Sequence, residues 1–199
     1  MFATISPIMR QAKFEFRTWG GRRKGAGRKP KGERAGVPHR ARPRFEKRQP
    51  IHVTVKVAPD VWNLRSRRSV TVIQTAVWKS ADRFGARVVE LSVQGDHLHM
   101  IVEAENTAAL VRSMKGLTSR VAKGLNRMMR RKGRVFADRY HTHVLRTPTE
   151  VRRAVHYLRN NHRKHMEEKG VTFSPTWIDP YATFALPPAR TWPLRGGPP

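Results

Sequence analysis

The spacing of apolar residues between Gln49 and Lys169 is the feature that most restricts the fold of this chain. A period of two predicts strands over 51–57, 89–93 and 97–104, and 140–147 is interpreted as a fourth strand. A spacing of three and four residues predicts helices over 70–84, 106–128 and 147–165. The segment order is therefore strand, helix, strand, strand, helix, strand, helix.

This order predicts a particular sheet. Two strand–helix–strand halves surround a central hairpin, whose turn is marked by Gly95-Asp96. The simplest arrangement of these segments is an α+β, ferredoxin-like fold. It has a four-stranded antiparallel sheet, with the first and second helices on the same face. The last helix is extra to that core. Its start is marked by Pro148 and by Thr147 with Glu150 three residues later, which together form a capping-box pattern.

The charge of the chain points to a polyanionic partner. Lysine and arginine number 41 against 14 acidic residues, which gives a formal net charge of +27. The usual partners for such a surplus are nucleic-acid phosphates or anionic membrane surfaces. No apolar run approaches the ~18 residues of a membrane-spanning helix, and the first residues lack a signal-peptide pattern. Because the chain also has no cysteine, we expect a cytoplasmic protein that meets nucleic acid and no membrane.

The composition divides the chain into three parts. Residues 1–48 contain a Gly-, Pro- and Arg/Lys-rich run without apolar periodicity, and we expect a disordered basic arm. Residues 49–169 form the folded domain, and 170–199 are a Pro-rich tail. The GAGRKPKG segment of the arm is similar to short hooks that lie in AT-rich minor grooves. The alternative is a solvated tail with nonspecific phosphate affinity.

Two sets of cations are candidate DNA-binding residues. One lies in the arm, and the other forms a stripe on the helix predicted after Asn106. For the stripe, simple solvation of an outer helix face is the alternative. The two sets are Arg22, Arg23, Lys24, Arg28, Lys29 and Lys31 in the arm, and Arg112, Lys115, Lys123, Arg127 and Arg130 on the helix.

Two histidines follow the predicted turn. His97 and His99 come after a turn at an edge of the sheet and are two apart on a strand, so their imidazoles project from the same face, while Leu98, Met100 and Val102 enter the core. Two such imidazoles form half of an open metal site, although a pair of surface histidines is the simpler interpretation. The nearby acids Asp96, Glu103 and Asp138 are given turn or surface roles. A second pair, His141 and His143, ranks lower as a metal site.

One tyrosine of the last predicted helix could complete a site. Tyr157 and Asn161 are four residues apart and therefore share one side of that helix, beside an apolar stripe. Core packing is the ordinary role of such a tyrosine. A phenol attacks poorly at neutral pH unless a cation or a base favours the phenolate, or unless a metal ion polarises the phosphate it attacks. The histidine pair and Tyr157 therefore need each other.

The motifs GDHLHMIVEA and RVFADRYHTHVLRTPTEVRRAVHYLRNN carry a family resemblance. The first resembles the His-hydrophobic-His signature of HUH endonucleases. The second resembles the tyrosine region of REP-associated tyrosine transposases and their insertion-sequence relatives. The resemblance implies that His97 and His99 ligate Mg²⁺ or Mn²⁺ and that Tyr157 is the nucleophile. It places Asn161 as a third ligand, but many relatives continue from this Asn into Pro, whereas here His162 follows, so Asn160 and His162 stay open.

The resemblance also implies a function. We expect a metal-dependent enzyme that nicks single-stranded DNA and transfers the strand through a 5′-phosphotyrosine intermediate, at sites flanked by hairpins. Members often work as dimers, so a homodimer associated with a bacterial nucleoid is expected. The alternative is a noncatalytic basic protein that binds single-stranded DNA or RNA hairpins. A ribosome-associated basic protein would explain the charge but not the histidine and tyrosine motifs.

Overall fold

A computed structural model describes residues 44–182 and residue 186. All of them belong to one of two compact units, the one that spans Val37–Pro199. The six candidate cations of the arm lie outside the described residues. No helix within 44–182 is long and apolar enough to cross a membrane.

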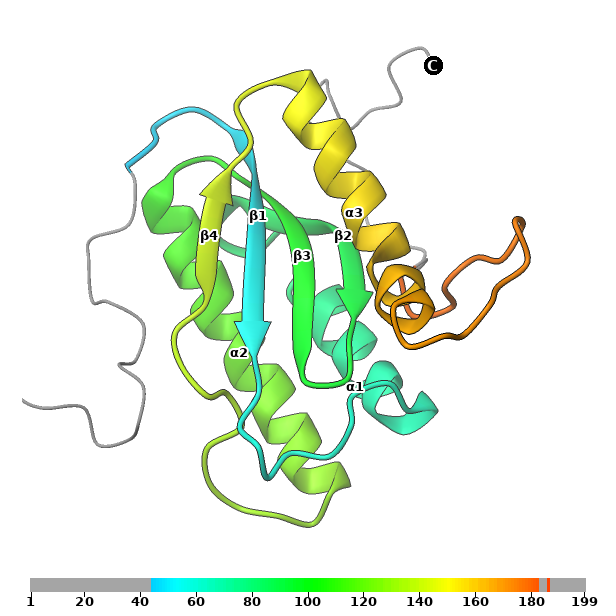
Figure 1. Cartoon of the computed structure of the whole chain (residues 1–199). Helices are drawn as coiled ribbons and strands as arrows, with labels where there is room; N and C mark the ends of the chain where they lie inside the picture. Colours follow the sequence, from blue (N-terminus) through cyan, green and yellow to red (C-terminus); the bar gives the residue numbers. More distant parts are fainter. Residues whose placement is uncertain (1–43, 183–185, 187–199) are drawn as a thin grey trace, which may run out of the picture. The chain divides into compact units, whose positions relative to one another are not determined.

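The centre of the fold is an antiparallel sheet of four strands. These are β1 (Gln49–Lys56), β2 (Ala86–Val93), β3 (His97–Ala104) and β4 (His141–Val144). Their order across the sheet is β2-β3-β1-β4, with every neighbouring pair antiparallel. Figure 1 shows this order, with β3 and β1 in the interior. The prediction of an α+β fold with a ferredoxin-like sheet is confirmed.

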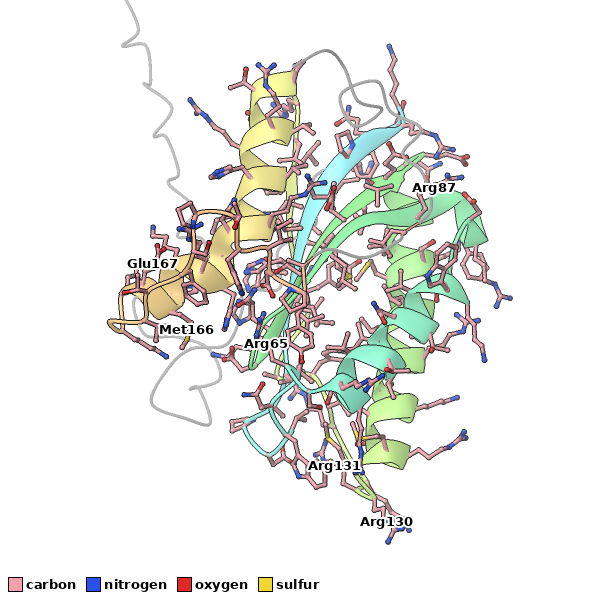
Figure 2. The ribbon with its side chains drawn as sticks, turned by 90° about the vertical axis from the view of Figure 1, so that its right-hand side faces the viewer. Arg65, Arg87, Arg130, Arg131, Met166 and Glu167 are labelled. Atoms are coloured by element: carbon pink, nitrogen blue, oxygen red, sulfur yellow. The ribbon has the colours of Figure 1, made fainter. Side chains whose placement is uncertain are left out.

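Helices cover both faces of the sheet. Helix α1 (Arg67–Trp78) and helix α2 (Thr107–Met128) lie on one face, and α3 (Pro148–Glu167) lies on the other, as Figures 1 and 2 show together. The larger core lies between the sheet and the first two helices and includes Ile51, Val53, Leu98, Met100, Val102, Ile73, Met114 and Leu117. A smaller cluster of Ile101, Leu145, Val151, Ala154 and Leu158 fixes α3 to the opposite face. The hydrophobic effect therefore holds α3 against the sheet.

The structure corrects three sequence predictions. The first helix ends at Trp78 instead of Phe84, because Asp82 and Phe84 adopt left-handed φ angles of 55° and 60° that a helix cannot contain. The chain there makes a short 3₁₀ turn, η1 (Arg83–Gly85), before β2. The last strand is only four residues long. At the start of α3, the Thr147 side chain accepts from the Glu150 N–H as predicted, but the Glu150 carboxylate accepts from Arg146 instead of Thr147.

The segment after α3 packs on the folded core. Arg65 donates to both carboxylate oxygens of Asp179 at 2.8 and 3.0 Å, and Asp179 is fully buried. The Arg65 guanidinium also lies over the Tyr181 ring at 4.6 Å, and the Tyr181 carbonyl accepts from the Val93 N–H at 2.8 Å. Figure 2 shows Arg65 beside this segment. Residues 179–181 therefore extend the outer edge of β2, although the boundary at 169/170 stays a prediction.

Candidate active site

The site lies on the face of the sheet that α3 covers. His97 and His99 project from the first residues of β3, and their Nε2 atoms are 3.0 Å apart. Both histidines follow the β2–β3 turn, and β3 is paired on both sides, with β2 and with β1. This placement explains why the His99 side chain is only 5% exposed. His99 is therefore not an ordinary surface histidine.

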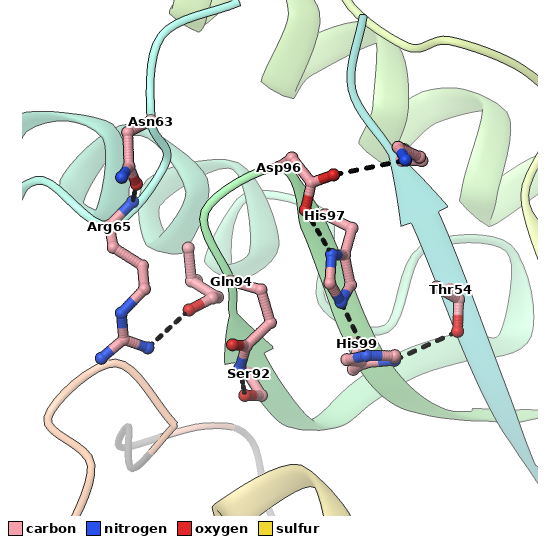
Figure 3. Close-up of polar contacts among 10 residues, drawn as sticks. Thr54, Asn63, Arg65, Ser92, Gln94, Asp96, His97 and His99 are labelled. Carbon is pink, nitrogen blue, oxygen red and sulfur yellow. Dashed lines mark hydrogen bonds and ion pairs between the residues drawn. The ribbon is translucent and has the colours of Figure 1, made fainter. Parts of the chain in front are cut away.

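The outward nitrogen of His97 faces a carboxylate. Its Nδ1 lies 2.7 Å from Asp96 Oδ1, and the other oxygen of Asp96 is 3.4 Å from the Lys56 ammonium (Figure 3). Burial alone would raise the pKa of Asp96, but the hydrogen bond and charge of His97 and the Lys56 ammonium outweigh it and lower the pKa. Because an ionised carboxylate only accepts, Nδ1 of His97 carries the proton. Its Nε2 lone pair is then directed at His99, as in carboxylate–histidine–metal triads.

The other nitrogen of His99 faces strand β1. Nδ1 lies 3.1 Å from Thr54 Oγ1 and 3.2 Å from His52 Nε2. The register explains the contact, since Thr54 is directly opposite His99 across the two strands. Burial, followed by the charges of His97, His52 and His165, lowers the pKa of His99 to about 3. The imidazole is therefore neutral at pH 7 and has a lone pair available for a metal ion.

Strand β1 contributes a third imidazole. Burial lowers the pKa of His52, and the charge of His143 adds to the shift. His143 is opposite His52 in the register of β1 with β4, and His141 is opposite Thr54. The second histidine pair therefore lies on the same face as the first, with β1 between them. Both of its side chains are exposed.

Tyr157 of α3 lies against these rings. Its ring centroid is 5.2 Å from that of His99 and 6.0 Å from that of His52, both in edge-to-face geometry. The side chain remains 42% exposed. Tyr157 is therefore not a core residue, and the structure brings the phenol from the last helix to the imidazole pair while leaving it open to solvent.

Asn161 is the buried member of the three candidates for a third ligand. It is 2% exposed, and its amide nitrogen has no hydrogen-bond partner. Asn160 instead donates to the His156 carbonyl one turn back, and the His162 ring lies near Trp177. His162 therefore lies on the side of α3 that faces the tail. Burial, followed by the charge of Arg65, lowers the pKa of His162. Asn161 shares the helix side of Tyr157, and its amide oxygen, not the unpartnered nitrogen, is the atom that could bind a cation.

The spacing of the two imidazoles fits a divalent cation. Two ligands at ~2.1 Å from Mg²⁺ and at right angles to each other are ~3.0 Å apart, which matches the two Nε2 atoms. Between residues 44 and 182, no group of three or more His, Cys, Asp or Glu side chains forms a metal site. The third protein ligand therefore stays a prediction. With oxygen ligands beside the two imidazoles, the site would suit Mn²⁺ or Mg²⁺.

Only part of the predicted cationic stripe on α2 lines a groove in the structure. Lys123 and Arg127 line an open groove of about 500 Å³ between α1 and α2, together with Lys79 and Arg120, which sequence reasoning missed. Arg112 and Lys115 do not line it. Arg130 lies beyond the helix end with a left-handed φ of 50°, and Figure 2 shows it at the far tip of α2. Within the described residues, no acidic side chain lines this groove.

The turn or surface role predicted for Glu103 was wrong, and the turn role predicted for Asp96 was incomplete. Asp96 contacts His97 directly, and Glu103 is completely buried, not on the surface. Sequence reasoning also missed His52 and Thr54 as partners of His99. The available signal was the alternation over 51–57, which places both residues on one face of β1, but the register that brings them to His99 is not visible in it.

The comparisons with known proteins first give a class, that of DNA transposases. Residues 53–168 match the family model described as transposase, IS200-like. This match spans more than half of the chain, which therefore belongs to the IS200-like transposase family. The family resemblance in the sequence is thereby confirmed. No match was found among curated proteins.

Two solved structures resemble the fold. A REP-associated tyrosine transposase bound to a REP hairpin is 15% identical with a TM-score of 0.52, over 65% of this chain and 74% of that one. A candidate transposase from Deinococcus radiodurans R1 is 13% identical with a TM-score of 0.43, over 66% of this chain and 98% of that one. At this level of identity, the first likeness supports the shared fold.

Proposed function

We propose that this transposase nicks single-stranded DNA and transfers the strand through a 5′-phosphotyrosine intermediate at Tyr157. The observation that carries the proposal is the meeting of Tyr157 with His99, whose ring centroids are 5.2 Å apart although the residues are on different elements. An exposed phenol beside the His97–His99 pair gives a nucleophile next to a candidate cation site. Ordinary packing would require neither an exposed phenol at this position nor a histidine pair beside it.

His97, His99 and Asn161 would hold the cation, with Asp96 and Thr54 orienting the two imidazoles. When bound, Mg²⁺ or Mn²⁺ supplies Lewis-acid polarisation of the scissile phosphate and orients it for in-line attack. Asp96 keeps the proton of His97 on Nδ1, so Nε2 stays free. Thr54 and His52 offer acceptors to Nδ1 of His99. Leu158, next to the nucleophile and fully buried, fixes the helix that presents Tyr157.

The covalent step balances without ATP. The Tyr157 oxygen forms a bond to phosphorus and loses its proton to solvent, while the bond from phosphorus to the 3′-oxygen breaks. The leaving oxygen takes a proton and becomes a free 3′-hydroxyl. Because the tyrosyl phosphodiester conserves the energy of the broken bond, a 3′-hydroxyl can later attack it and rejoin strands.

Hairpin DNA is the proposed substrate. The structural neighbour was solved with a REP hairpin, and the cations of the arm and of α2 would bind the phosphates of such DNA. Each phosphate contact releases counterions, so binding should weaken steeply with salt. A homodimer and an association with the bacterial nucleoid in the cytoplasm belong to the same proposal.

Trapping the adduct tests the chemistry. Hairpin DNA with a single-stranded flank is incubated with the full chain and Mn²⁺, with a label at either the 3′ or the 5′ end. Because Tyr157 keeps the 5′-phosphate, the 3′ label should migrate with the protein and the 5′ label should be released on a shorter strand. Tyr157→Phe should abolish the adduct, and Tyr181→Phe, in the tail, is the matched control.

The same experiment separates an enzyme from a noncatalytic binder. An adduct that persists in Tyr157→Phe removes Tyr157 from the role of nucleophile. Binding without any adduct in the wild-type chain, across Mn²⁺ and Mg²⁺, would favour the noncatalytic basic protein.

A further inference from the structure

Loop 57–66, between β1 and α1, contains an indole that packing does not explain. Trp62 is 59% exposed, whereas its neighbours Val61 and Leu64 are buried in the core. Exposing a large aromatic side chain forgoes the stabilisation that burial would give. Because the residues on both sides are anchored, the loop presents Trp62 outward in a fixed position.

Backbone hydrogen bonds join this loop to the turn that carries the site. The Leu64 N–H donates to the Gly95 carbonyl at 2.9 Å, and the Val57 N–H donates to the Asp96 carbonyl at 2.8 Å. The loop and the β2–β3 turn lie at the same end of the sheet in Figure 1, and Figure 3 shows Asn63 on the chain beside that turn. The path from Trp62 to Leu64, across the hydrogen bond to Gly95 and on to His97 puts the α-carbons of Trp62 and His97 at most ~20 Å apart.

The surroundings of Trp62 favour an anionic, flat ligand. Arg67 and Arg68 follow in the first turn of α1, and both are exposed. The acids of this region are neutralised, since Asp60 pairs with Arg131 and Asp96 pairs with Lys56. An exposed aromatic ring a few residues along the chain from exposed cations is a combination that suits single-stranded nucleic acid, with bases stacked on the ring and phosphates on the cations.

We infer that Trp62 is a base-stacking platform for the single strand that enters the His97–His99–Tyr157 site. The inference rests on the proposed function for its substrate, but not on the nicking chemistry. An unpaired base stacked on the indole would set the position of the strand relative to Tyr157. Paired bases in a duplex could not stack in this way.

Binding measurements in the absence of chemistry test the inference. The full chain with Tyr157→Phe is titrated in EDTA into a fluorescein-labelled oligothymidine of about 16 nucleotides, the upper range of single-strand site sizes, and into a blunt duplex of the same length. Trp62→Ala should weaken single-strand binding about 5- to 150-fold. Duplex binding should change much less. Trp62→Phe should retain most of the affinity.

Trp78 gives a matched control. It is 52% exposed at the end of α1. The chain after it leads to Gly85, whose carbonyl accepts a hydrogen bond from the Glu105 N–H, and Glu105 follows the end of β3 that is opposite His97. Trp78→Ala should leave single-strand affinity unchanged. Oligothymidine should quench the tryptophan fluorescence of the wild type and of Trp78→Phe. It should quench the fluorescence of Trp62→Phe less. This measurement reports on stacking even if Trp62→Ala folds poorly.

Equal losses for Trp62→Ala and Trp78→Ala would overturn the inference, as would an equal loss on single strand and duplex. Unchanged quenching in Trp62→Phe would also overturn it. Because no step in these measurements needs cation or nucleophile, they are independent of the adduct experiment. Loss of the adduct with intact Trp62 stacking would refute only the proposed chemistry.

Discussion

Acid should destabilise the fold through His99, whose pKa burial and neighbouring charges lower from an ordinary value of ~6.5 to about 3. Between these two values the unfolded chain binds a proton at His99 and the folded chain does not. Stability therefore falls as the pH is lowered through this window, and it is fully present above pH ~6.5. At pH ~4.5 the imbalance amounts to about 2–3 kcal/mol.

Urea unfolding in EDTA, measured from neutral pH down to pH ~4.5, checks this value. His99→Asn keeps a polar group near Thr54 but has no titrating ring, so its stability should fall by about 2–3 kcal/mol less than that of the wild type over the same range. Other titrating groups are shared and largely cancel in the comparison. Parallel curves for the two proteins would refute the reasoning, because they would mean that folded His99 accepts a proton as easily as unfolded His99.

Two further changes test other parts of the structure. Asp96→Asn removes the carboxylate that orients His97, and we expect a 10- to 100-fold weaker affinity for Mn²⁺ by calorimetry, with an unchanged melting temperature in EDTA. Asp179→Ala leaves the largely buried Arg65 guanidinium without its carboxylate partner and with only the Val93 carbonyl, among the described residues, as an acceptor, and we expect a loss of about 3 kcal/mol in urea unfolding. Glu90→Ala, which breaks the more exposed pair with Arg159, should cost less than about 1 kcal/mol and serves as the control.

The fold was predictable because its signals are local. The alternation in 51–57 and 97–104 and the helical spacing after Asn106 each fix one element, and the order of elements then permits few sheets. The end of α1 was not predictable, since Ala81 and Phe84 continue the apolar spacing while the backbone reverses at Asp82. Phe84 gives no signal for its left-handed φ angle, whereas Asp82 is of a residue type that adopts this conformation more often than most.

The candidate site was only partly visible in the sequence. His97, His99, Tyr157 and Asn161 stood out because each pair is close along the chain. His52, Thr54 and Arg120 did not, because their importance depends on strand register and on how two helices pack, which are long-range properties. Asp96 was visible but was explained as a turn residue, although a turn residue next to a histidine can also orient it.

Three imidazoles in a row, His97, His99 and His52, place facing nitrogens 3.0 and 3.2 Å apart. Each neutral ring carries one N–H proton, so the tautomers of neighbouring rings depend on one another. If His97 and His99 held a cation through nitrogen lone pairs, the His99 proton would lie on Nδ1, and Thr54 or His52 would accept it. If His52 accepts through Nε2, its own proton must lie on Nδ1. Cation binding by the histidines of β3 would then change the hydrogen bonding of His52 on β1, beside Tyr157.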